Sequence, residues 1–187
     1  PEFQDAEDWI QYAVDRLSPE MAKQVYPDGA QKELASGYHW VTLRQFEAFA
    51  ELLHKVGRAL PESFEEGFER MYNYSASVLR PDGYAPLNND ADRSDHRLWV
   101  REGAVRYERP DWLWMVNNGE EGEQPDGVPS RVFPWAGHVV MRSGWDRDAH
   151  WGFFDVGPWG IGHQHNDKLH VSVAAYGRDL LVDGGRM

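Results

Sequence analysis

Apolar residues in the first part of the chain recur every three to four positions, which is the spacing of an amphipathic helix. Residues 5–17, DAEDWIQYAVDRL, place on one helical face the apolar residues Trp9, Ile10, Ala13, Val14 and Leu17. The same spacing predicts a helix over about residues 38–60, and Pro61 starts another helix with acidic residues in its first turn. The stretch at 81–95, rich in Pro, Asn and Asp, is predicted to be a loop. Helices of this kind, with short or medium connections, are compatible with antiparallel packing.

The pattern changes after an acidic, Gly/Pro-rich stretch at residues 117–130. Beyond it, short apolar runs are separated by Gly, Asp and Pro, namely HVVMRSGW, HWGFFDV, LHVSVAAYG and RDLLVDGG. Such runs are typical of antiparallel strands, and YGRD between the last two predicts a hairpin. We therefore expect an α+β, multidomain chain, with a helical domain in 1–110, a linker in 111–130 and the start of a β-sandwich in 131–187.

Composition removes several classes of function. The formal net charge is −12, from 31 acidic and 19 basic residues, which argues against nucleic acid as a partner. The absence of cysteine excludes disulfides, thiolate metal sites and a cysteine nucleophile. No apolar stretch approaches the roughly 18 residues of a transmembrane helix, so no membrane partner is expected. Nine Trp residues mainly indicate core packing, although flat aromatic faces also serve carbohydrate sites.

Two histidines stand one residue apart in GIGHQHND, between the second and third apolar runs. On an extended backbone such residues point the same way, so His163 and His165 could face one site, with Asp167 in the same row. Asp183 ends the last run, and the hairpin would bring this run beside the third one. Imidazole and carboxylate are ligands that zinc accepts, but His165 and Asp183 do not complete a site. The alternative is a polar loop whose histidines form local hydrogen bonds.

Two motifs resemble the heparinase II/III family of polysaccharide lyases. That family carries a Gly-His-x-His-x-Asp segment followed by Ala-Tyr-Gly-x-x-Leu-Leu-Val-Asp-x-Gly, and matching residues stand here at 162–167 and 175–185. Upstream, residues 28–39 are similar to the family's Asp-Gly-x-x-x-Glu-x-x-x-x-Tyr-His motif. The motifs occur in the family's order and separation, and the resemblance spans nearly all of the chain.

The resemblance implies a partial (α/α) toroid followed by an antiparallel β-sandwich, with the active site between them. It implies catalytic roles for Tyr38 and His163, and zinc binding by His165 and Asp183. It also implies a periplasmic or secreted protein. The family's Asn-His pair and a further zinc-binding His fall outside these 187 residues, so we expect an internal fragment of a longer chain that is inactive alone.

A lyase of this family would act on an acidic polysaccharide by removing the C5 proton of a uronic acid and expelling the 4-linked sugar. The charge that builds at the sugar carboxylate must be neutralised, and a base must reach the proton. Tyr38 suits the role of base and then acid, while His163 would supply charge or hold the carboxylate. The predicted substrate contacts are Glu33, Arg142 and His39, the last as a structural neighbour of Tyr38 rather than a catalyst. Asp167 is assigned a supporting position behind the zinc ligands.

Two other functions stay open at this point. A glycoside hydrolase would need two carboxylates flanking the bond, and the acidic residues of ESFEEGFE have the spacing of a solvated helix face. A carbohydrate-binding protein without catalytic activity would keep the same fold. The polymer is equally open, since heparan sulfate, hyaluronan, alginate and other exopolysaccharides all contain uronic acids.

Overall fold

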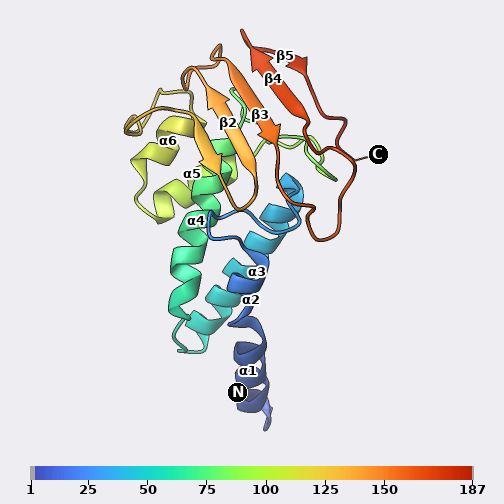
Figure 1. Ribbon diagram of the computed structural model, residues 1–187. Coiled ribbons are helices and arrows are strands. Elements are labelled where there is room, and N and C mark those ends of the chain that lie inside the picture. Colours follow the sequence, from blue (N-terminus) through green and yellow to red (C-terminus); the bar gives the residue numbers. More distant parts are fainter. Residues whose placement is uncertain (1–2, 187) are drawn as a thin grey trace.

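The computed structural model describes residues 3–186, and Figure 1 shows the sheet in the upper part beside α5 and α6, with α1, α2, α3 and most of α4 below it. The helices are α1 Ala6–Leu17, α2 Glu20–Gln24, α3 Ser36–Lys55, α4 Glu62–Val78, α5 Arg97–Arg106 and α6 Pro110–Val116. The strands are β1 Arg131–Phe133, β2 His138–Arg142, β3 Trp151–Asp155, β4 Val171–Ala175 and β5 Arg178–Leu181. The α+β class is therefore confirmed. The described residues form one sheet, so the toroid and the sandwich stay predictions.

Helix α3 ends five residues before the predicted boundary near Leu60. Gly57 adopts a left-handed backbone with φ +69°, its N–H donates to His54 O, and the N–H of Arg58 donates to Leu53 O. This pair of bonds is the Schellman arrangement, which closes a helix and which glycine adopts without steric cost. The helical spacing of apolar residues continues past Gly57, but the turn at this glycine ends the helix.

The predicted linker at 111–130 begins too early. Residues 110–116 form α6, which starts with Pro110 at its first turn, and Trp112 in this helix is fully buried. Trp112 stacks on Tyr72 of α4, so α6 belongs to the helical core. The segment without helix or strand starts at Asn117 and runs to Ser130.

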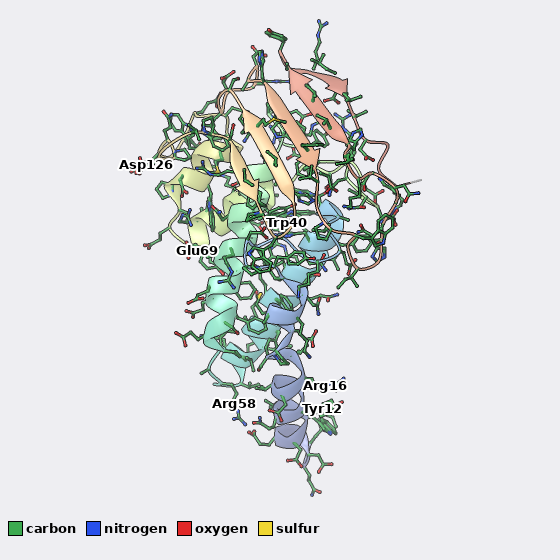
Figure 2. All side chains as sticks on the ribbon, in the orientation of Figure 1. Tyr12, Arg16, Trp40, Arg58, Glu69 and Asp126 are labelled. Carbon is green, nitrogen blue, oxygen red and sulfur yellow. The ribbon has the colours of Figure 1, made fainter. Side chains whose placement is uncertain are left out.

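Helix α4 lies at the centre of the helical layer and contacts α2, α3, α5 and α6. Trp40 of α3, labelled in Figure 2, is 3% exposed and meets the ring of Tyr72 edge-on. By contrast, α1 has no buried residue, and its Tyr12 is 66% exposed at the far end from the sheet. Burial thus increases from α1 toward the sheet. Within residues 3–186, no helix combines the length and the apolar character needed to cross a bilayer.

The sheet is an antiparallel meander in the order β1-β2-β3-β4-β5. The predicted hairpin at YGRD is confirmed, because β4 pairs with β5 through Ala175 opposite Arg178. A second apolar core joins the sheet to the helices: Tyr74 and Val78 of α4 pack with Phe133, Trp151 and other residues of the strands. The C-terminal half of α4 is therefore buried between helices on one side and the sheet on the other.

Two histidines, His39 and His96, are buried in the helical layer, and their lowered pKa values predict how the stability of the fold depends on pH. Burial lowers the pKa of His39 to about 3 and that of His96 to about 4. The unfolded chain binds protons at these imidazoles near pH 6.5, and the folded chain does not until near pH 4. The free energy of unfolding should therefore fall as the pH decreases from 6.5 toward 4.

Urea denaturation of the wild type and His39→Gln at pH 7.5 and pH 5 tests this expectation. The variant should lose less stability between the two pH values, because one of the groups that protonates on unfolding is gone. His54→Gln, at an exposed position near the end of α3, is the control. An equal loss in wild type and His39→Gln would contradict the assignment of a neutral, buried His39.

Candidate active site and metal centre

Three of the predicted site residues meet at the junction of the helices and the sheet. Tyr38 lies in the first turn of α3, and His163 lies in the loop between β3 and β4. Their rings stack with centroids 3.6 Å apart and planes inclined by 16°. The Nδ1 atom of His163 is 2.5 Å from Oε2 of Glu33, which precedes α3. His163 thus joins two residues that precede it by 125 and 130 positions. We call Glu33, Tyr38 and His163 the Tyr38 cluster, and its side chains are partly open to solvent.

Arg186 adds a cation to this cluster. Its Nη2 atom donates to the hydroxyl of Tyr38 at 3.2 Å, and its guanidinium lies 5.9 Å from the centroid of the Tyr38 ring. The backbone holds it there, because the N–H of Arg186 donates to Ala91 O at 3.1 Å. Arg186 was not among the residues predicted from the sequence. In the sequence it is one arginine after a Gly-Gly pair, and only the path of the chain after β5 brings it to Tyr38.

The two histidines of the H-x-H motif do not face one site. The prediction of an extended row is wrong, because His163 has a left-handed backbone with φ +49° and follows Gly162 with φ +73°. These two residues turn the chain, so His163 points to Tyr38 and Glu33 while His165 points to a different group of carboxylates. The alternation of a strand does not apply to such a turn.

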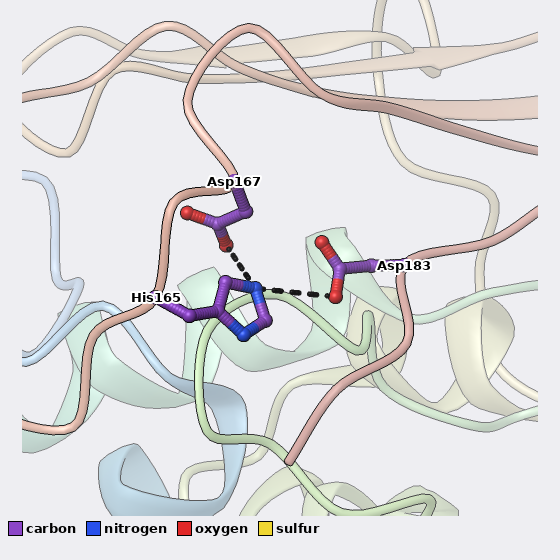
Figure 3. A group of neighbouring side chains, drawn as sticks. All are labelled: His165, Asp167 and Asp183. Atoms are coloured by element: carbon purple, nitrogen blue, oxygen red, sulfur yellow. Dashed lines mark ion pairs between the residues drawn. The ribbon is translucent and has the colours of Figure 1, made fainter. Parts of the chain in front are cut away.

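His165 forms a second cluster with Asp167 and Asp183, shown in Figure 3. The Nε2 atom of His165 is 3.2 Å from Oδ2 of Asp167 and 3.3 Å from Oδ1 of Asp183. The His165 side chain is 18% exposed, and the two carboxylates are 2% and 7% exposed. Asp183 follows β5, which the hairpin returns beside β4 as predicted.

This donor set fits a zinc ion. Ligand atoms about 2 Å from a tetrahedral zinc lie about 3.3 Å from one another, which is close to both measured separations. Asp167 has a further property of a ligand: its Oδ2 accepts from the N–H of Asn89 at 2.6 Å, but its buried Oδ1 has no hydrogen-bond partner. The cluster lines a cavity of about 780 Å³, which leaves room for further ligands. Asp167 thus lies beside the two predicted ligands, closer than the supporting position expected from sequence.

Two predicted substrate contacts are buried instead. His39 is 2% exposed, its Nδ1 accepts from the N–H of Gln31, and its Nε2 is 3.2 Å from Met71 O. Arg142 is 9% exposed, and its guanidinium donates to Leu79 O and lies 4.4 Å from the Trp145 ring centroid. Burial lowers the pKa of Arg142 to about 9. Neither side chain reaches the open cluster, so their assignment as substrate contacts is corrected to structural roles in the core.

Comparison with known proteins finds one matching family model and several similar lyases. Residues 1–107 match the family model described as Heparinase II/III N-terminus. A heparin-sulfate lyase of Pedobacter heparinus is 28% identical over 198 residues, which cover 99% of this chain and 29% of that protein. A heparin-sulfate lyase of Bacteroides stercoris is 26% identical, with 99% of this chain and 28% of that protein covered. The chain thus spans less than a third of the length of these relatives.

Solved structures are similar over the same range. A crystal structure of heparan sulfate lyase from Pedobacter heparinus superposes with a TM-score of 0.83 at 27% identity, covering 99% of this chain and 30% of that one. Heparinase III superposes with a TM-score of 0.86 at 21% identity, covering 99% of this chain and 32% of that one, a likeness that shows the fold alone. The family model matches more than half of the residues of this chain, and the chain therefore belongs to the heparinase II/III family.

Proposed function

We propose that this protein is a polysaccharide lyase that cleaves a uronic-acid-containing acidic glycan by β-elimination. The observation that carries the proposal is the contact of the Tyr38 hydroxyl with the Arg186 guanidinium, on a phenol ring that stacks on His163. Heparin-sulfate lyases among the relatives support the same class of reaction. Such polymers lie outside the cell, which favours a periplasmic or secreted protein.

Tyr38 acts as base and then as acid in this proposal. Its phenolate takes the C5 proton, the C–H electrons form the C4–C5 double bond, and the C4–O bond breaks. The leaving oxygen takes the proton back from the phenol, so no water is consumed. The negative charge on the phenolate oxygen has to be stabilised, and the Arg186 guanidinium lies 3.2 Å from this oxygen while it also pairs with Asp92 at 3.4 Å. A hydrolase instead needs a pair of carboxylates around the bond, and the two carboxylates near Tyr38, Glu33 and Asp92, already pair with His163 and Arg186.

His163 holds the substrate in place and is itself oriented by Glu33. The imidazole covers one face of the Tyr38 ring, and the Glu33 carboxylate 2.5 Å from Nδ1 fixes which way its nitrogens point. The remaining nitrogen is then directed away from Glu33 and is available to a substrate carboxylate. Together, Arg186 and His163 provide the neutralisation that proton abstraction next to a carboxylate requires.

The proposal includes a zinc ion held by His165, Asp183 and Asp167. When bound, the ion supplies a cross-link between the loop after β3 and the chain after β5, and takes no part in bond breaking. Asp183 also accepts from the N–H of Gly185, one residue before Arg186, so a fixed Asp183 helps to fix the arginine. The role proposed for the metal is therefore structural, in which binding energy stabilises the fold.

The role of Tyr38 predicts the effect of removing one oxygen atom. Tyr38→Phe in the full-length protein should lower turnover by a factor of about 10² or more, because general acid–base catalysis contributes that much. Its melting temperature should stay near that of the wild type, because the ring and its stacking on His163 remain. Release of unsaturated uronate from heparan sulfate, hyaluronan and alginate, followed by ultraviolet absorbance, measures turnover and identifies the polymer.

Tyr26→Phe is the matched control for this experiment, because Tyr26 is also partly buried but lies outside the Tyr38 cluster. Its turnover should equal that of the wild type. Wild-type turnover by the folded Tyr38→Phe protein would exclude Tyr38 as the base. Saturable glycan binding without product in the wild type would favour a binding protein, and reducing ends without unsaturated product would favour a hydrolase.

The contact of Arg186 with Tyr38 predicts a graded series. Arg186→Met should lower kcat/KM about tenfold or more, because a charge-assisted hydrogen bond to the reacting group is lost. Arg186→Lys keeps the charge but not the planar donor group, so its kcat/KM should fall between those of the wild type and Arg186→Met. Arg16→Met, far away on α1, is the control. Equal kcat/KM for Arg186→Met and Arg16→Met would show that Arg186 takes no part.

The proposed zinc site predicts a metal-dependent melting temperature. The full-length protein should contain about one zinc per chain, and chelator should lower its melting temperature. Free zinc at 100 times its dissociation constant adds about 2.7 kcal/mol of stability. His165→Ala should abolish the response to zinc, while His150→Ala, at an exposed histidine before β3, should keep it. Protein that binds no metal and melts equally with and without chelator would contradict the site.

A further inference from the structure

The loop that carries both histidines is closed at its base by one aspartate. We define the histidine loop as residues 156–170, between β3 and β4. The N–H of Asp155 donates to His170 O at 3.1 Å, and the N–H of Leu169 donates to Asp155 O at 2.8 Å. The Asp155 carboxylate accepts from the N–H of Gly157 at 2.9 Å and from Nζ of Lys168 at 2.8 Å. Asp155 therefore contacts residues near both ends of the loop at once.

Because Gly157 has no side chain, the start of the histidine loop can lie close to the turn before β2. A Cβ atom on Gly157 would lie 1.9 Å from Ala136 O, at the turn before β2. The N–H of Val156 donates to Gly137 O at 2.8 Å across the same gap. The beginning of the loop is thus pressed against the strand that carries His138.

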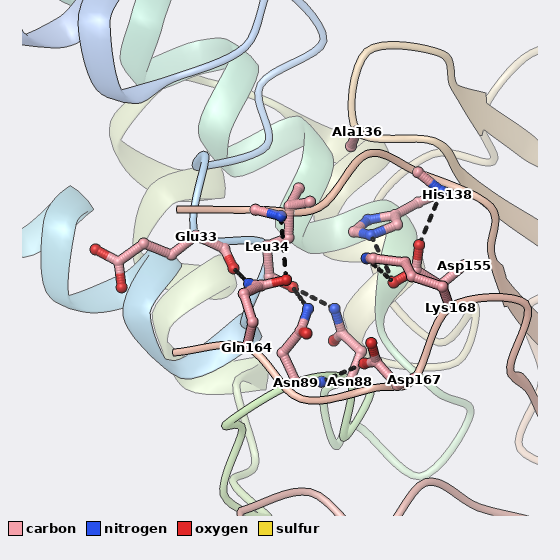
Figure 4. Close-up of polar contacts among 12 residues, drawn as sticks. Glu33, Leu34, Asn88, Asn89, Ala136, His138, Asp155, Gln164, Asp167 and Lys168 are labelled. Carbon is pink, nitrogen blue, oxygen red and sulfur yellow. Dashed lines mark hydrogen bonds and ion pairs between the residues drawn. The ribbon is translucent and has the colours of Figure 1, made fainter. Parts of the chain in front are cut away.

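His138 connects Asp155 to the helices. The two residues lie opposite each other in the register of β2 and β3, and Nε2 of His138 is 3.8 Å from Oδ2 of Asp155. On its other side, Nδ1 of His138 is 2.8 Å from the hydroxyl of Tyr74, which comes from α4. Figure 4 draws His138, Asp155 and Lys168 together beside the loop. Lys168, Asp155, His138 and Tyr74 form one polar chain from the histidine loop to the helical layer, buried except at Lys168. Its link between His138 and Asp155 is a 3.8 Å contact, in which Nε2 of His138 has no hydrogen-bond partner among the described residues.

The protonation of His138 decides which group donates and which accepts at each contact of this chain. Burial lowers the pKa of His138 to about 4, so the imidazole is neutral near pH 7 and carries one N–H. An ionised carboxylate only accepts, so the proton belongs on Nε2, which faces Asp155. Nδ1 is then the acceptor for the Tyr74 hydroxyl. Each member thereby presents the complementary group to the next.

Stability alone does not account for these residues. Buried ionic groups lose their hydration, and well-packed apolar residues of similar volume often give equal or greater stability. What a polar chain adds is a defined geometry, because the hydrogen bonds between Tyr74 and His138 and between Lys168 and Asp155 form together in only one arrangement. The arrangement that it defines is the position of the histidine loop relative to α4, and α4 packs against α3, which carries Tyr38.

We propose that the polar chain Lys168–Asp155–His138–Tyr74 is a positioning device that holds His163 in its stacked contact with Tyr38. The inference rests on the proposed lyase function, in which these two rings work together. Tyr74, His138 and Asp155 are positioning residues, since they act through the loop and touch neither substrate nor the reacting atoms. Displacement of reacting groups by about 1 Å can cost a factor of about 10² in rate, so loosening the chain should be visible in turnover.

Tyr74→Phe and Tyr72→Phe form a matched pair that tests the proposal in the full-length protein. Both phenols lie on α4 and are buried, and the hydroxyl of Tyr72 donates to Glu47 at 2.7 Å, away from the sheet. Tyr74→Phe should lower kcat about tenfold or more with KM changed less than about threefold, because the substrate contacts remain while the alignment is lost. Tyr72→Phe should lose a similar amount of stability but keep its kcat.

Two further measurements separate this inference from the proposed function. The first is the kcat of Asp155→Asn, of Tyr74→Phe and of the double variant. The loss in the double variant should be much smaller than the product of the two single losses if both residues act through one chain. Hydrogen exchange at the amides of Leu169 and His170 should be faster in Tyr74→Phe than in Tyr72→Phe, and this readout needs no activity.

A wild-type protein that releases no unsaturated product would refute the proposed function, and hydrogen exchange would then decide the positioning claim. Equal exchange in the two tyrosine variants would overturn it. So would an active enzyme in which Tyr74→Phe and Tyr72→Phe have the same kcat, even if the exchange rates differ.

Discussion

The structure depends on the burial of helix α4 from two sides. Its Phe64, Phe68 and Met71 pack in the helical core, while Tyr74 and Val78 pack against the sheet. Both cores exclude water along the same helix, so neither layer can shift without exposing apolar surface of the other. Close packing on one shared helix gives the helices and the sheet a fixed relation, and the candidate site lies where they meet.

That junction places two clusters of different character near each other. The Tyr38 cluster combines an aromatic pair, a cation and a partly exposed carboxylate, which is suited to binding and proton transfer. The His165 cluster has two buried carboxylates and one imidazole, which is suited to a cation. Both clusters receive residues from the histidine loop and from the chain after β5. Their positions are coupled because they share these segments.

Backbone amides and asparagines connect the segments around the two clusters. The side chains of Asn88 and Asn89 donate to the carbonyl of Leu34, and the N–H of Asn89 donates to Asp167. The side chain of Gln164 donates to Glu33 O. Figure 4 shows these contacts between the segment before α3, the loop after α4 and the histidine loop. Buried polar groups of this kind are costly when unpaired, so the three segments are held in register.

Charge has to act locally in this protein. The chain carries a net charge of −12, which is unfavourable for a polyanion at long range. Screening confines the interactions of exposed charges to about 8 Å at physiological salt. For the proposed acidic glycan, Arg186 beside Tyr38 therefore matters more than the total charge does. Acidic residues elsewhere on the helices are compatible with such a substrate.

The sequence by itself determined that helices precede strands, the approximate positions of α1, α3, α4 and β2–β5, the hairpin after β4, and the motifs that contain Glu33, Tyr38, His163 and Asp183. The short elements α2, α5 and β1 were not predicted. The predicted features are local, because hydrophobic periodicity and turn residues act over a few positions. The end of α3 at Gly57 and the inclusion of α6 in the core were missed, since capping and burial compete with the pattern that predicted them. Only the tertiary structure decided which side chains face each other: it buried His39 and Arg142, separated His163 from His165 by a left-handed turn, and brought Arg186 to Tyr38. Those outcomes depend on contacts between residues 32 to 148 positions apart and on single backbone angles, and neither leaves a periodic signal in the sequence.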